Sequence, residues 1–132
     1  MLFWIFMLVM NLLIPISMIG FGKLFMKTTP KEINGLFGYR TSMSMKNKDT
    51  WIFAHHYCGK LWYVIGRYLI FFTILAMLVA IGKEEEYVGK LGGIICYIQL
   101  ILLVGSIYPT EKALRKTFDH NGNRKNSNKI NI

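Results

Sequence analysis

Asn34-Gly-Leu-Phe-Gly-Tyr-Arg-Thr-Ser-Met-Ser-Met-Lys-Asn-Lys-Asp-Thr-Trp51 is a polar, basic connector between two segments that are apolar enough to span a bilayer. No charged residue occurs at positions 1–22, and residues 68–82 and 91–110 are also free of charge. Apolar runs of about 18 or more residues with few charges are typical of transmembrane helices. The sequence therefore predicts an all-α integral membrane protein with three transmembrane helices.

The predicted boundaries follow from these runs. Transmembrane helix 1 takes residues 1–26, the connector 27–60, transmembrane helix 2 residues 61–82, a short external loop 83–87, transmembrane helix 3 residues 88–108, and a basic tail 109–132. The uncharged part of the second run would rise only about 22 Å, short of a hydrocarbon core of about 30 Å. Extending this helix to Leu61 takes Arg67 into the span, so we expect the Arg67 side chain to reach outward to the interface.

The distribution of basic residues predicts the orientation. The connector and the tail carry six Lys or Arg each, and three spans place both on one side of the membrane. The positive-inside rule assigns that side to the cytoplasm, so the N-terminus is expected outside and the C-terminus in the cytoplasm. The chain has a net charge of +9, and its basic residues flank the apolar runs. We therefore expect anionic lipid headgroups as its partner and no direct nucleic-acid binding.

Polar residues within the apolar runs are candidates for contacts between helices. Asn11 and Gln99 fall near the middle of their runs, at similar depth. Small residues at helical spacing accompany them, and such residues let membrane helices approach closely. Either Asn11 and Gln99 hydrogen-bond to each other across helices 1 and 3, or each is satisfied separately by a carbonyl group or water.

The connector combines a cation with helix-starting residues. Arg40 offers five donors to a phosphate or carboxylate, and a lipid, the loop itself or a binding partner could accept them. Asn47 is a suitable N-cap. Residues 49–60 are predicted to form an amphipathic interfacial helix before helix 2, with Trp51 at headgroup level. The tail from residue 121 onward is predicted to be disordered.

Metal binding, cofactor binding and catalysis are not expected. His55 and His56 are adjacent, so on a helix they point about 100° apart and do not readily share one metal ion. Cys58 and His120 do not complete a metal-ligand set or a catalytic set with them.

The connector resembles the signature of the SdpI family of bacterial membrane proteins. The residues that carry the resemblance are Asn34, Gly38, Tyr39, Arg40, Thr41, Ser44, Asn47 and Trp51. The named member of that family confers immunity to a secreted, membrane-active peptide toxin and is thought to hold a transcriptional repressor at the membrane. The resemblance implies a multi-pass protein of the bacterial cell membrane that binds a peptide toxin. It also implies a cytoplasmic repressor as partner, bound by a surface centred on Tyr39-Arg40-Thr41.

Two other functions fit the same pattern of spans. A small transporter or accessory membrane subunit, working as a homo-oligomer, would account for Asn11, Arg67 and Gln99, because polar groups inside the membrane often mark pathways. A phage holin also has three spans and a basic tail, but the long motif-bearing connector fits it less well. Growth arrest on expression would favour a holin, and resistance to toxin would favour immunity.

Overall fold

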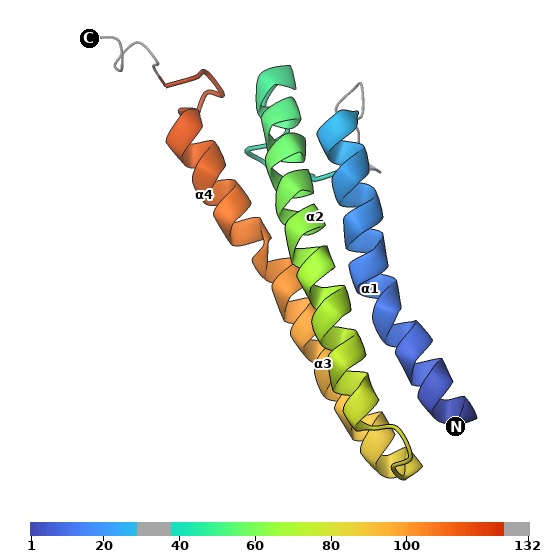
Figure 1. The fold of residues 1–132 in the computed structure, drawn as a ribbon. Coiled ribbons are helices and arrows are strands. Elements are labelled where there is room, and N and C mark those ends of the chain that lie inside the picture. Colours follow the sequence, from blue (N-terminus) through green and yellow to red (C-terminus); the bar gives the residue numbers. More distant parts are fainter. Residues whose placement is uncertain (29–37, 126–132) are drawn as a thin grey trace.

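The computed structural model describes residues 1–28 and 38–125, and within them it contains four α-helices (Figure 1). Their bounds are α1 Leu2–Lys27, α2 Lys48–Val79, α3 Glu85–Gly105 and α4 Ile107–Thr117. Three elements are long and apolar enough to cross a membrane, namely α1, α2 and the α3–α4 pair Glu85–Thr117. The predicted all-α fold is therefore confirmed in the described residues, with three helical elements that are long and apolar enough to cross a membrane.

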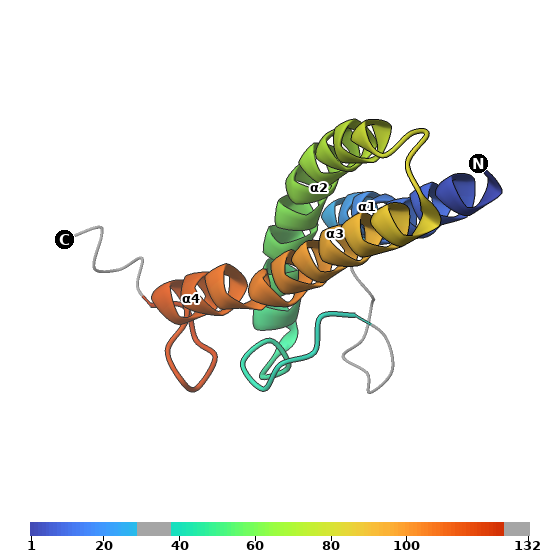
Figure 2. The ribbon, with the colours of Figure 1, turned by 90° about the horizontal axis from the view of Figure 1, so that it is seen from below.

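The helices form an elongated bundle whose loops lie at two ends (Figure 1). At one end the N-terminus lies by the α2–α3 turn, where Trp4 Nε1 donates a 2.7 Å hydrogen bond to Met77 O. At the other end the connector lies beside the start of α2 and the loop that follows α4 (Figure 2). Connector and tail thus share one end of the bundle. Its orientation in the membrane stays a prediction from the charges.

The most extensive helix contact joins α1 and α2. A Cβ atom built on Gly22 would lie 2.6 Å from Gly59 O, and one on Gly59 would lie 2.7 Å from Gly22 O. The two backbones therefore touch at a point where only glycine fits. A Cβ on Gly66 would lie 2.9 Å from Pro15 O, so the backbones of α1 and α2 are also close at this second point. This is the small-residue packing that drives helix association in lipid.

Helix α2 runs without a break from Lys48 to Val79. The segment predicted to be an interfacial helix, residues 49–60, forms its first turns, and residue 61 is not a helix boundary. Asn47 is the N-cap, as predicted, and its side chain accepts a hydrogen bond from Thr50 N. The location of these turns at a membrane surface stays a prediction.

Helices α3 and α4 replace the single predicted span of residues 88–108. α3 begins at Glu85, and the acidic residues of its first turn suit the positive end of the helix dipole. The helix ends at Gly105 and resumes at Ile107 as α4. Pro109 explains the break, because it has no N–H to donate to Gly105 O and its ring crowds that carbonyl. In the first turn of α4, where N–H groups lack partners within the helix, the same proline is tolerated.

Candidate functional site: the connector–tail cluster

A network of polar contacts joins the connector, the start of α2, α4 and the tail at one end of the bundle. We call it the connector–tail cluster, and it consists of Tyr39, Thr41, Ser44, Asn47, Thr50, His55, Glu111 and Gly122. Four of these residues belong to the signature quoted above. These four signature residues therefore lie together at one place in the fold.

Glu111 on α4 accepts hydrogen bonds from two hydroxyl groups of the connector. Tyr39 donates to Glu111 Oε2 at 2.6 Å, and the Thr41 hydroxyl donates to the same oxygen at 2.7 Å. Burial and the adjacent carboxylate raise the pKa of Tyr39 above its ordinary value. The phenol consequently keeps its proton and acts as a donor at physiological pH. Hydrogen bonds to a charged acceptor are stronger than neutral ones, so Glu111 holds the connector firmly against α4.

His55 on α2 holds the same connector from the other side. Its Nε2 accepts a 2.8 Å hydrogen bond from Tyr39 N, so the proton of the neutral ring sits on Nδ1, which lies 2.8 Å from Trp51 O. The ring is fully buried and packs between Trp51 and Phe25. Gly38 has a φ of +112°, and a Cβ there would overlap His55 Nε2. The signature glycine therefore allows the connector to reach the histidine.

Ser44 closes a tight turn in the connector. Its hydroxyl accepts from Thr41 N at 2.9 Å and lies 3.0 Å from Tyr39 O, while Ser44 N donates to Thr41 Oγ1 at 3.1 Å. Thr50 Oγ1 donates to Ser44 O at 3.0 Å and so ties the turn to α2. Ser44 is fully buried. These reciprocal bonds fix the backbone on both sides of Arg40.

Asn47 joins the start of α2 to the tail. Its Oδ1 accepts from Thr50 N at 2.9 Å, and Thr50 Oγ1 accepts in return from Asn47 N at 3.0 Å, which is a capping box. Its Nδ2 donates to Gly122 O at 2.7 Å. Gly122 has a φ of +86° and would place a Cβ 2.6 Å from Asn47 Nδ2. A glycine is therefore needed at this tail position.

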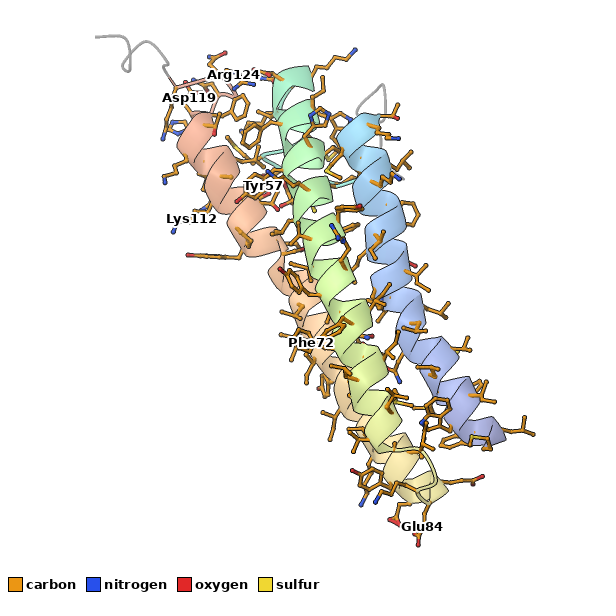
Figure 3. The ribbon with its side chains drawn as sticks, in the orientation of Figure 1. Tyr57, Phe72, Glu84, Lys112, Asp119 and Arg124 are labelled. Carbon is orange, nitrogen blue, oxygen red and sulfur yellow. The ribbon has the colours of Figure 1, made fainter. Side chains whose placement is uncertain are left out.

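The tail folds back on α2 beyond the end of α4. Arg124 makes two hydrogen bonds of 2.9 Å to the carboxylate of Asp49, and its guanidinium lies 5.0 Å from the centre of the Phe118 ring. Figure 3 shows Arg124 reaching toward the start of α2. Asp119 accepts from the backbone N–H groups of Asn123 and Asn121, which lower its pKa below the ordinary value. The prediction of disorder was thus wrong for residues 121–125.

The remaining signature residues have different positions. Arg40 is exposed between the two anchored residues Tyr39 and Thr41. Trp51 has no exposed surface and packs on His55, so its ring does not face lipid headgroups; its depth in the membrane stays a prediction. Asn34 lies outside the described residues.

Gln99 links α3 to both of the other membrane-spanning elements. Its Nε2 donates to Asn11 O on α1 at 2.8 Å and to Thr73 Oγ1 on α2 at 2.9 Å. The side chain of Asn11 donates instead to Met7 O in its own helix. The side chains of Gln99 and Asn11 therefore do not bond to each other: each donates to a carbonyl group, which is the second of the two alternatives, and Gln99 still joins α3 to α1 through the carbonyl of Asn11.

Arg67 lies on the outside of the bundle. Its side chain is exposed, and the guanidinium lies 5.4 Å from the centre of the Tyr63 ring. The expected reach of Arg67 to the membrane interface stays a prediction. Arg67 does not meet Asn11 or Gln99, which are buried.

Sequence reasoning missed several members of the cluster. His55 was considered only as a metal ligand, and Glu111 was not singled out. In the described residues no group of three or more His, Cys, Asp or Glu could hold a metal ion. One signal was available for Thr50, because a Thr three residues after an N-cap Asn can complete a capping box.

The three long apolar helical elements indicate a multi-pass α-helical membrane protein. The chain belongs to the SdpI/YfhL protein family, whose model matches residues 31–110. The match confirms the resemblance of the connector and covers the signature residues, most of the cluster and two of the spans. Searches of curated proteins and of solved structures each gave no match. Membership of this family supports a membrane immunity-type function in general.

Proposed function

We propose that this chain protects a bacterium from a secreted, membrane-active peptide toxin. It acts in the bacterial cell membrane, with its N-terminus outside and the connector–tail cluster in the cytoplasm. Family membership and the three candidate spans support this proposal. The basic connector and tail, which share one end of the bundle, support the orientation.

The observation that carries the proposal furthest is the convergence of Tyr39 and Thr41 on Glu111. A connector that served only to join two spans would not need a buried network to fix its shape. Here the network holds the backbone on both sides of the exposed Arg40. Such a preorganised polar surface suits recognition of a protein, and we assign it to a cytoplasmic repressor that is held at the membrane when toxin is present.

A small transporter or accessory subunit working as a homo-oligomer is the second candidate. One observation favours it, namely that Arg67 is exposed on α2 within the predicted span. A charged side chain facing away from its own bundle suits contact with a second copy.

Survival of a toxin-sensitive bacterium tests the proposal. Cells expressing the chain are challenged with peptide toxins of the kind that this family counters, beside cells expressing Arg40→Ala or the control Lys46→Ala, which removes another exposed connector charge. Immunoblots of membrane fractions establish equal amounts of protein. Protection that is lost in Arg40→Ala and kept in Lys46→Ala supports immunity acting through the connector surface.

The opposite results are equally informative. A lack of protection against every toxin, with normal membrane insertion, would contradict the immunity proposal and favour the transporter or accessory subunit. Growth arrest on expression without toxin would favour a holin. Protection kept in both variants would support immunity and would show that Arg40 is not required for it.

A further inference from the structure

A groove of about 540 Å³ runs along the junction of α3 and α4. Its lining changes from apolar to basic along one helix face, and consists of Val104, Ile107, Tyr108, Glu111, Lys112 and Arg115. These positions follow helical spacing, so their side chains lie on adjacent turns. The groove therefore carries an apolar half and a charged half in line with each other.

The charged half has a surplus of cations. Lys112 and Arg115 make no ion pair with any acidic side chain in the described part of the chain. Lys125 Nζ donates a 2.9 Å hydrogen bond to Arg115 O and adds an ammonium group at this end. The carboxylate of Glu111 opposes these three cations, but its Oε2 is occupied by the hydroxyl groups of Tyr39 and Thr41. The net charge of this half is positive, which suits an anionic ligand.

The apolar half lies where the membrane-spanning run ends. Val104 is 62% exposed and Tyr108 is 72% exposed, although both belong to the uncharged run of residues 91–110. Apolar side chains so exposed on a span face lipid tails, and an exposed tyrosine at the end of a span is typical of the headgroup level. Lys112 projects from α4 away from α2 in Figure 3. We therefore expect the boundary between hydrocarbon and water to cross this groove near Tyr108.

We propose that the groove binds one anionic phospholipid. An acyl chain lies against Val104 and Ile107, Tyr108 sits beside the glycerol region, and Lys112 and Arg115 bind the phosphate and the negatively charged headgroup. A soluble anion would use only the basic half, and a zwitterionic lipid would leave part of the positive charge uncompensated. The site is independent of the immunity proposal, because it uses neither Arg40 nor a toxin.

Native mass spectrometry of the purified full-length chain in detergent tests this site. Phosphatidylglycerol and phosphatidylcholine of equal chain length are titrated separately against three proteins: the unsubstituted chain, the double variant K112Q/R115Q and the control K46Q/K48Q. The control removes the same charge from the exposed start of α2 and the connector, outside the groove. Circular dichroism verifies equal helix content.

We expect one phosphatidylglycerol per chain, bound more tightly than phosphatidylcholine. K112Q/R115Q should weaken this binding about 30-fold, since each basic residue near an anionic surface contributes roughly a fivefold factor, while the control should stay within about twofold. Should the double variant lose helix content, Lys112→Gln and Arg115→Gln alone are each expected to weaken binding about fivefold.

Three results would overturn the proposal. Equal weakening in K112Q/R115Q and K46Q/K48Q would indicate general attraction to a basic surface. Equal affinity for both lipids would show that the basic residues do not select an anionic headgroup. Binding of inorganic phosphate as tight as that of phosphatidylglycerol would show that the apolar half has no part in the site.

Discussion

The hydroxyl of Tyr39 donates a 2.6 Å hydrogen bond to Glu111 although 72 residues separate the two in the chain. Tyr39 belongs to the connector between α1 and α2, and Glu111 to α4 after the last span. The bond therefore closes the bundle at one end, as Trp4 does at the other by donating to Met77 O. Because its partner lies on α4, this hydrogen bond makes the conformation of the connector depend on the position of α4.

Replacing Glu111 with Ala should release the connector. Tyr39 and Thr41 would lose their shared acceptor, and an unpaired polar group that is buried costs about 1–3 kcal/mol. We expect the free energy of unfolding in detergent to fall by about that amount and the connector to be cut faster by trypsin. Glu111→Gln should have a smaller effect, because its amide oxygen still accepts a hydrogen bond.

Glu86→Ala is the matched control for that substitution. Glu86 lies at the other end of the bundle, its side chain is 74% exposed, and its pair with Lys90 is on the surface. Exposed ion pairs contribute about 0–1 kcal/mol. An equal loss of stability in both variants would contradict a special role for Glu111.

His55→Phe should loosen the connector without emptying the core. Phenylalanine keeps an aromatic ring between Trp51 and Phe25 but has no nitrogen to accept from Tyr39 N. Burying that N–H unpaired should lower the free energy of unfolding by about 1–3 kcal/mol. Thermal unfolding in detergent measures the loss. His56→Phe, at the exposed neighbouring residue, is the control. A comparable loss of stability in that variant would contradict the prediction.

The three membrane helices could be predicted because lipid forces the backbone to satisfy its own hydrogen bonds. A long uncharged run that crosses a membrane is therefore expected to form a helix. The N-cap at Asn47 was also readable, since an N-cap depends on local side-chain chemistry. The continuity of α2 was not settled by the sequence, because residues 49–60 have the same helical period whether they lie on a membrane or continue into the span.

The cluster itself could be predicted only as a set of signature residues. Its partners His55 and Glu111 lie 16 and 72 residues from Tyr39, and no local pattern encodes such contacts. The break between α3 and α4 has a local cause in Pro109. The third predicted span accordingly ends at residue 108, next to this proline.

The pH dependence of the tail turn follows from Asp119. Backbone N–H groups of Asn123 and Asn121 hold its pKa below the ordinary 3.8, so the charged form favours the folded tail. Its contribution is present above the unfolded pKa and is lost as the pH falls through the lower, folded value. Amide exchange at Asn123, corrected for its intrinsic pH dependence, should show constant protection from neutral pH down to about pH 5 and loss below the ordinary pKa. Asp119→Asn should remove the transition, and a transition that persisted in this variant would assign it to another group.

Gly22→Ala should weaken the contact between α1 and α2, and Gly20→Ala should not. A Cβ on Gly22 would lie 2.6 Å from Gly59 O and 2.8 Å from Tyr63 N, both backbone atoms that move only if the helices separate. Overpacking of this kind costs about 1–3 kcal/mol. Gly20 lies two residues earlier in the same helix and has open space where its Cβ would point, so alanine there should be neutral or stabilise the helix by up to about 1 kcal/mol. Thermal unfolding of both variants in the same detergent compares the two sites directly. Equal stability of the two would mean that the backbones do not touch at Gly22.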